Sequence, residues 1–169
     1  MPTVIYLLDS TVFIESARRY YAFDIAPPFW HALIEYADNG KLQSIDRVKV
    51  ELNRLKDELT NWANGHFHQW FVSSDQSDVI EAYAKVITWA HAQAQFTDRA
   101  KSEFAAADNA DPWVIAYSYA KGCIVVTDEK FNPDIRREIK IPNVCRGPAF
   151  NIRCIDTFAM LRELGFKFR

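Results

Sequence analysis

The amino-acid sequence predicts an α/β fold of three layers, in which helices cover both faces of a central, mainly parallel sheet. Two observations predict this class. Short apolar runs alternate along the chain with longer segments in which apolar residues recur at helical spacing. Three of these runs are followed closely by acidic residues. Parallel strands with right-handed helical connections place their carboxyl ends at one edge of a sheet, so we expect these acidic residues to meet there.

Length and composition predict one domain, residues 1–169. The chain has 169 residues, of which 49% are hydrophobic and 25% charged, and its net charge is −2. This charge neither indicates nor excludes a nucleic-acid ligand, because phosphate binding requires only a local basic patch. No apolar run approaches the ~20 residues of a membrane span, and the first residues lack the pattern of a secretory signal. The three cysteines, an odd number, indicate reduced thiols and a cytoplasmic protein.

The first strand is expected at residues 4–8, where a short apolar run ends at Asp9. Ser10 and Thr11 then begin a helix with an apolar inner face. Asp9 therefore lies between the end of a parallel strand and the start of the helix that follows it. This is the edge where open α/β sheets bind ligands. The alternative for Asp9 is a structural role as a helix cap.

A second helix is expected between Pro27 and Asn39, and a second strand at residues 42–45. From residue 47 to 62, apolar residues recur at helical spacing, which predicts one long amphipathic helix. Glu51 falls near the second turn of this helix. A lone glutamate on a helix is usually solvated, so its role depends on what else reaches the same edge.

Further elements are expected on either side of the central segment. Residues 66–71 are an aromatic stretch that either extends an edge of the sheet or forms a lid. Residues 75–77 cap another long helix, and residues 97–106 form a shorter one. Near the end of the chain, residues 143–146 predict a brief strand and residues 155–164 a closing helix.

The central segment carries the clearest local signals. Asp111 followed by Pro112 predicts a helix start, with the aspartate as N-cap and the proline in the first turn. Residues 123–126 are a continuous apolar run, typical of a strand buried on both faces, and Asp128 and Glu129 follow it. A helix and the strand after it run in opposite directions. The acids at the start of this helix and at the end of this strand therefore fall at the same edge.

Four acidic positions are expected at the carboxyl edge of the sheet: Asp9, Glu51, Asp111 and one of the pair Asp128 and Glu129. So many carboxylates repel one another strongly unless a cation lies between them. A set of oxygen ligands without cysteine or histidine suits Mg²⁺ or Mn²⁺ better than zinc. Such ions polarise phosphoryl oxygens and lower the pKa of a water molecule, so the predicted chemistry is phosphodiester hydrolysis.

Four motifs follow one another along the chain: residues 7–13, Glu51 on a long helix, residues 110–116 around Asp111, and residues 124–129. Together and in this order they resemble the motifs of the PIN-domain ribonucleases, the group that contains the VapC-like toxins of prokaryotic toxin–antitoxin pairs. The resemblance implies a PIN-like three-layer fold, metal-dependent cleavage of RNA and the role of toxin in a type II pair. The segment between Glu51 and Asp111 is long and rich in aromatic residues, which indicates an elaborated branch of the family.

The resemblance also implies roles for individual residues. Four acids would bind Mg²⁺ or Mn²⁺ and act in catalysis: Asp9, Glu51, Asp111 and Glu129. Four further residues would support them, through hydroxyls or as accessory ligands: Ser10, Thr127, Asp108 and Asp128. The fourth acid is expected two residues after Thr127, which selects Glu129 and leaves Asp128 as the near alternative.

Three partners are expected from the resemblance: an RNA substrate, an antitoxin protein and a second copy of the chain. Basic side chains near the acidic edge are candidates for phosphate contacts: Lys49, Arg54, Arg99, Lys101, Lys130, Arg136 and Arg137. Glycine-rich phosphate loops are absent, which argues against nucleotide-cofactor enzymes.

Two alternative functions remain open from the sequence. One is a PIN-like module that binds a partner without catalysing a reaction. The other is a haloacid-dehalogenase-type phosphatase, in which Asp9 would be the nucleophile. That family expects a second aspartate two residues further on, and Thr11 occupies this place.

Overall fold

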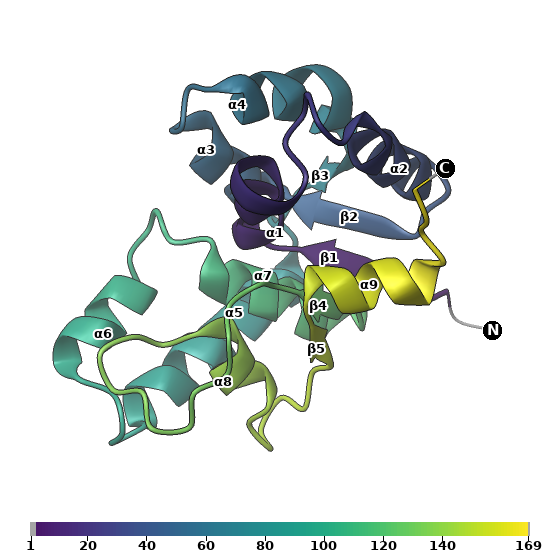
Figure 1. The fold of residues 1–169 in the computed structure, drawn as a ribbon. Coiled ribbons are helices and arrows are strands. Elements are labelled where there is room, and N and C mark those ends of the chain that lie inside the picture. The colour runs from purple at the N-terminus through teal and green to yellow at the C-terminus, as the bar shows by residue number, and fades with distance from the viewer. Residues whose placement is uncertain (1–2, 169) are drawn as a thin grey trace.

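In a computed structural model that describes residues 3–168, five parallel strands form the central sheet (Figure 1). The strand order is β3-β2-β1-β4-β5, and every pairing is parallel. The strands are β1 (Tyr6–Leu8), β2 (Leu42–Ile45), β3 (Phe71–Val72), β4 (Ile124–Val126) and β5 (Cys154–Ile155). The predicted α/β class with a parallel central sheet is therefore confirmed.

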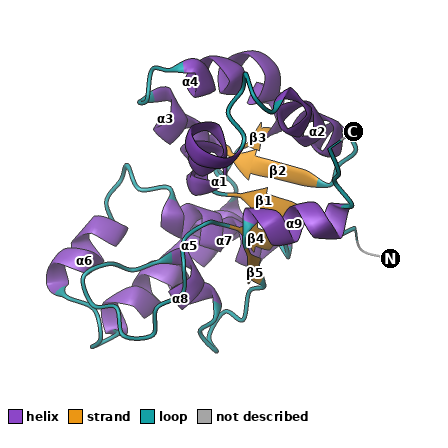
Figure 2. Cartoon of the chain, in the orientation of Figure 1, coloured by secondary structure: helices purple, strands orange, loops and turns teal. Residues whose placement is uncertain are grey.

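Helices connect the strands and cover both faces of the sheet, as Figure 2 shows. The helices are α1 (Ser10–Glu15), α2 (Pro27–Asp38), α3 (Asp46–Asn53), α4 (Glu58–Trp62), α5 (Ser77–Ala92), α6 (Asp98–Phe104), α7 (Asp111–Lys121), α8 (Ile141–Cys145) and α9 (Thr157–Leu164). In Figure 1, α9 lies in front of the sheet, and α5 and α7 lie behind it. No helix within residues 3–168 is long and apolar enough to cross a membrane.

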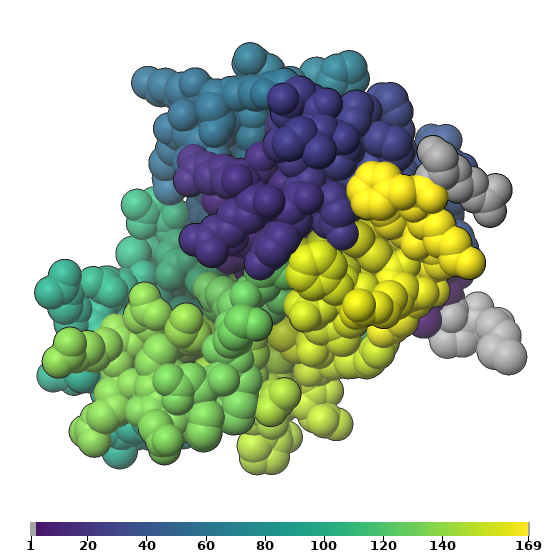
Figure 3. All heavy atoms as spheres, viewed as in Figure 1, coloured from purple at the N-terminus to yellow at the C-terminus, as the bar shows by residue number. Residues whose placement is uncertain are grey.

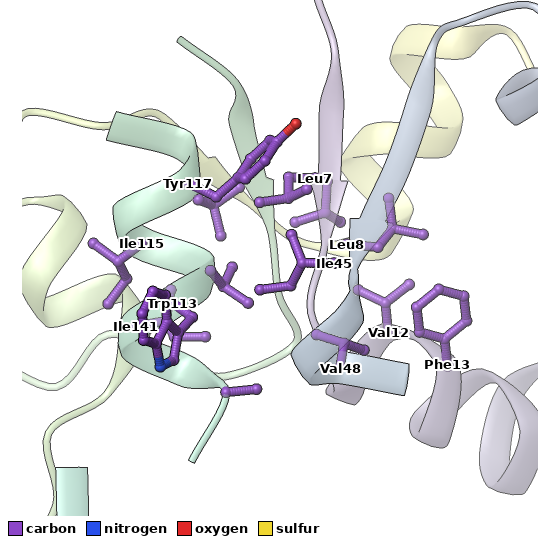
Figure 4. Close-up of a cluster of buried hydrophobic side chains, with 14 of the residues drawn as sticks. Leu7, Leu8, Val12, Phe13, Ile45, Val48, Trp113, Ile115, Tyr117 and Ile141 are labelled. Atoms are coloured by element: carbon purple, nitrogen blue, oxygen red, sulfur yellow. The ribbon is translucent and has the colours of Figure 1, made fainter. Parts of the chain in front are cut away.

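The sheet is buried because apolar side chains of its strands pack against the helices on both faces. Leu7 and Leu8 have no exposed surface. Figure 4 shows Ile115 and Tyr117 of α7 on one side of the strands and Phe13 of α1 on the other. Burying one such side chain stabilises the fold by roughly 1.5–3 kcal/mol. This two-sided core fixes where the strands end, and so where the residues that follow them lie.

The aromatic residues between α4 and β3 extend the core. Phe67 is fully buried, and its ring centroid lies 5.5 Å from that of Phe13 and 5.3 Å from that of Trp62. Phe71 then enters the edge strand β3, which pairs with β2. Of the two alternatives for residues 66–71, the extension of a sheet edge is confirmed for the last residue, Phe71.

The long helix predicted from residue 47 to 62 is wrong, because the chain breaks it into α3 and α4. Lys56 adopts a left-handed φ of 52°, which a continuous α-helix does not allow. Asp57 then caps α4, and its carboxylate accepts a hydrogen bond from the N–H of Thr60 at 3.1 Å. The periodicity of the apolar residues continues across this break, so the pattern alone did not reveal it.

The strand predicted at residues 143–146 is also wrong, because residues 143–145 belong to α8 and Arg146 caps its end. Pro142 lies in the first turn of the helix, where proline is well tolerated. The fifth strand is instead β5, whose two residues pair with β4. A strand this short has no periodicity to recognise in the sequence.

Candidate metal centre

Three carboxylates meet at the carboxyl edge of the sheet: Asp9 after β1, Asp111 at the start of α7, and Glu129 after β4. One oxygen of each lies within 4.8 Å of the other two. Strands β1 and β4 are neighbours, with Leu8 opposite Val126, so the residues after them lie side by side. Helix α7 leads into β4 from behind the sheet, so its first residue returns to the same edge (Figure 1). We call these three residues the acidic cluster.

Asp9 is buried and accepts hydrogen bonds on both of its carboxylate oxygens. Its Oδ1 accepts from the N–H of Thr11 at 3.0 Å and from the hydroxyl of Thr11 at 2.6 Å. Its Oδ2 accepts from the hydroxyl of Thr127 at 2.7 Å, and the two hydroxyl oxygens lie 3.2 Å apart. These bonds hold the carboxylate in one orientation between β1 and β4.

The hydroxyl beside Asp9 comes from Thr11, although the sequence had indicated Ser10. Within residues 3–168, the Ser10 side chain has no hydrogen bond, whereas Thr11 Oγ1 also accepts one from the N–H of Asp128 at 2.9 Å. Thr127 makes the kind of supporting contact that the resemblance implied. A sequence signal for Thr11 existed, because an aspartate before a helix commonly accepts a hydrogen bond from the backbone N–H two residues further on, which brings that residue beside it.

Burial and mutual repulsion raise the pKa of the acidic cluster. Burial, and then the charge of Glu129, raises the pKa of Asp9 to about 7. Burial also holds the pKa of Asp111 well above its usual range, with further increases from the charges of Glu129, Asp9 and Glu51. The pKa of Glu129 is raised by burial as well. The basic side chains of the protein thus do not compensate the negative charge that these three carboxylates carry when ionised. A bound divalent cation would compensate it.

Glu51 reaches the acidic cluster through the backbone that precedes Asp111. Its Oε1 accepts a hydrogen bond from the N–H of Ala110 at 2.9 Å. The prediction that Asp111 is the N-cap is wrong: Ala110 holds that position, and Asp111 is the first residue of α7. The N–H of Asp111 donates to Oδ1 of Asn109 at 3.0 Å. The Asp111 carboxylate is therefore not used to cap the helix and belongs to the cluster instead.

The two remaining predicted acids lie apart from the acidic cluster. Asp128 faces α9, where its Oδ1 accepts from the N–H of Thr157 at 3.1 Å and from its hydroxyl at 2.9 Å. Asp108 is exposed and lines a separate cavity of about 190 Å³ with Arg47 and Arg54. Of the pair that the sequence left open after β4, the structure brings Glu129 to the cluster and turns Asp128 away.

Asp128→Ala is expected to lower the free energy of unfolding by about 1–2 kcal/mol and to leave the affinity for Mn²⁺ unchanged. The variant removes the acceptor of two hydrogen bonds from Thr157, which is buried. Glu129→Gln is the matched comparison, and it should weaken Mn²⁺ binding at least tenfold. Chemical denaturation and titration calorimetry measure the two effects. Equal losses of metal affinity in both variants would contradict these separate roles.

Beside the acidic cluster lies a cavity of about 150 Å³, lined by Asp111, Glu129 and a lysine that the sequence had not indicated, Lys140. The N–H of Ile141, the next residue, donates to Oε2 of Glu129 at 2.8 Å. The Lys140 ammonium lies 3.6 Å from Oε2 of Glu138. No local motif marks this lysine. Lys140 lies beside the acids because the loop between β4 and α8 runs back to the edge of the sheet.

Comparison with known proteins agrees with this fold at low sequence identity. The family model described as "Domain of unknown function (DUF4411)" matches residues 6–168. A chain in the crystal structure of VapBC2 from Rickettsia felis, bound to a DNA fragment from their promoter, is similar to this one with a TM-score of 0.54. The identity is 14%, and the match covers 90% of this chain and 98% of that chain. No curated protein matches. The predicted PIN-like three-layer fold is confirmed.

Proposed function

We propose that this chain, which belongs to the DUF4411 family, is a ribonuclease that hydrolyses RNA phosphodiester bonds with Mg²⁺ or Mn²⁺. The observation that carries the proposal is the acidic cluster of Asp9, Asp111 and Glu129, whose oxygens lie within 4.8 Å of one another. It lies at the carboxyl edge of the sheet, where α/β folds bind ligands. The similarity to a VapBC2 structure supports the same class of function.

The acidic cluster fits a hard divalent ion, because all of its ligand atoms are carboxylate oxygens. A bound ion would supply positive charge to a phosphoryl oxygen and lower the pKa of the attacking water. The chain contributes rigid positions for these ligands. Asp9 is held by Thr11 and Thr127, and Glu129 by the N–H of Ile141. Ligands that are already oriented cost little reorganisation when charge develops in the reaction.

Glu51 is the fourth acid of this proposal and has a different place from the other three. Its hydrogen bond to the N–H of Ala110 ties α3 to the first turn of α7. Its charge acts directly on Asp111 and contributes to the raised pKa of that residue. We propose that Glu51 positions Asp111 through this backbone contact and would help to order water near a bound ion.

The test is cleavage of a broad panel of RNAs by the purified protein with Mn²⁺ or Mg²⁺, which EDTA should stop. Asp9→Asn, purified in the same way, controls for contaminating ribonucleases. If the wild-type protein leaves every RNA uncut, the ribonuclease proposal is wrong. Absence of Mg²⁺ and Mn²⁺ binding in titration calorimetry would then favour the binding module, and a covalent phosphate on Asp9 would favour the phosphatase.

We further propose that the ribonuclease is the toxin of a type II toxin–antitoxin pair. This rests on the similarity to the VapBC2 structure, which the alignment follows over 98% of that chain. Expression in a bacterial host should arrest growth, and Asp9→Asn should relieve the arrest. Harmless expression of an enzyme that is active in vitro would contradict the toxin role. A neighbouring gene for a small protein that binds this chain would identify the antitoxin.

A further inference from the structure

A second, larger cavity adjoins the one beside the acidic cluster. Its volume is about 900 Å³, against about 150 Å³ for the cavity that Asp111 and Glu129 line. Glu103 of α6 and Glu138 of the loop before α8 line both cavities, so the two lie side by side. The larger one, which we call the α6 groove, is lined by Thr97, Arg99, Glu103, Asp134, Ile135, Arg136, Arg137 and Glu138.

Hydrogen bonds join the two walls of the α6 groove, the segment before α6 and the loop before α8. The N–H of Thr97 donates to the carbonyl of Arg136 at 2.9 Å. The Gln95 amide donates to the carbonyls of Pro133 and Ile135 at 2.8 and 2.7 Å. In Figure 1 the green loop between β4 and α8 runs beside α6, and Figure 3 shows it at the molecular surface. Because these bonds lie within the chain, the groove is formed before any ligand arrives.

The two carboxylates at the junction of the cavities are each paired with a cation. Arg99 Nε lies 2.9 Å from Oε1 of Glu103, and Lys140 Nζ lies 3.6 Å from Oε2 of Glu138. These pairs reduce the repulsion that the junction would exert on a phosphate. Lys140 also lines the cavity of the acidic cluster, so this cavity has a cation beside its carboxylates.

Beyond the junction, the α6 groove presents two exposed arginines, Arg136 and Arg137. Neither has an ion pair within residues 3–168, whereas both carboxylates of the junction do. Asp134 is the remaining acid of the lining. The groove is thus balanced in formal charge, with three arginines and three acids in its lining. Guanidinium groups bind phosphates through paired hydrogen bonds.

We propose that the α6 groove is the path by which single-stranded RNA reaches the acidic cluster, with Arg136 and Arg137 binding phosphates on one side of the cleaved bond. The inference rests on the proposed ribonuclease function and adds where the strand lies. A strand whose cleaved phosphate occupies the 150 Å³ cavity leaves it through the junction, and the neighbouring 900 Å³ groove accommodates the nucleotides that follow.

The experiment measures binding and cleavage by Arg136→Gln/Arg137→Gln. A fluorescent 12-nucleotide single-stranded RNA with 2′-O-methyl groups, which resists cleavage, is titrated with each protein in Mg²⁺ over a range of salt concentrations. The variant should bind about tenfold more weakly. Its salt dependence, as a log–log slope, should fall in magnitude by about 1.4, because each single-strand phosphate contact contributes about 0.7. With a cleavable RNA of the same length, KM should rise about tenfold and kcat should stay unchanged.

The matched control is Lys41→Gln/Lys167→Gln, which removes the same charge from exposed positions. Lys41 immediately precedes β2, at the edge of the sheet opposite the acidic cluster. This control should bind the 12-nucleotide RNA like the wild type. A dinucleotide, which is too short to occupy the groove, should be cleaved equally by the wild type and by both variants.

The outcomes separate this inference from the ribonuclease proposal. Absence of cleavage by the wild type contradicts the proposed function, while the binding titration still tests the groove. Unchanged RNA affinity in Arg136→Gln/Arg137→Gln, or an equal loss in the control, overturns the groove as the RNA path. Displacement of the RNA analogue by an acidic peptide at lower concentration than by unlabelled RNA would assign the groove to a protein partner and also overturn it.

Discussion

Asp111→Asn is expected to lower metal-dependent RNA cleavage by about a thousandfold, equivalent to about 4 kcal/mol of transition-state stabilisation. The substitution keeps the size of the side chain but removes one of three carboxylates whose oxygens lie within 4.8 Å of one another. Affinity for Mn²⁺ should fall together with kcat, because the charge that attracts the ion is reduced. Single-turnover cleavage and titration calorimetry, both in Mn²⁺, measure the two losses.

The control is Asp24→Asn, which makes the same chemical change at an exposed position before α2. This variant should cleave RNA like the wild type and unfold at the same denaturant concentration. Full activity in Asp111→Asn would remove this residue from the proposed metal centre. Lost activity accompanied by unchanged metal affinity would assign Asp111 to the substrate or to the attacking water.

The metal-free protein is expected to lose stability as pH rises from about 4 to above 7. The pKa of Asp9 is about 7 in the folded chain and 3.8 ordinarily, so between these values the folded state keeps a proton that the unfolded state has released. The free energy of unfolding therefore falls through this window, by roughly 4 kcal/mol for Asp9. The raised pKa values of Asp111 and Glu129 act in the same direction. Urea denaturation in EDTA at a series of pH values measures this slope.

Asp9→Asn isolates the contribution of this carboxyl group. At pH 8 in EDTA, the variant should be more stable than the wild type, because it buries no charge and its amide can still bond to Thr11 and Thr127. Near pH 4 the difference should disappear. Saturating Mg²⁺ should stabilise the wild type and have little effect on the variant. A wild type whose stability in EDTA is level from pH 4 to pH 8 would contradict the raised pKa.

Much of the site could be predicted because its residues adjoin elements with strong local signals. Asp9 and Glu129 follow short apolar runs that are typical of buried strands, and Asp111 precedes a proline in the first turn of a helix. Once alternating strands and helices are recognised, the topology sends all three to the same edge. The elements that were missed carry weaker signals. The break at Lys56 preserves the apolar periodicity, and β5 has two residues.

The sequence by itself determined the parallel sheet and the segments that bring acids to its carboxyl edge, because both follow from apolar periodicity and chain direction. Only the tertiary structure decided what each side chain contacts. The Asp128 carboxylate bonds to Thr157, whereas the Glu129 carboxylate lies in the acidic cluster, although Asp128 and Glu129 are adjacent in sequence. The tertiary structure also brought Lys140 to the acids by way of a loop. The orientation of a side chain depends on donors and charges from distant segments, and no local pattern encodes these.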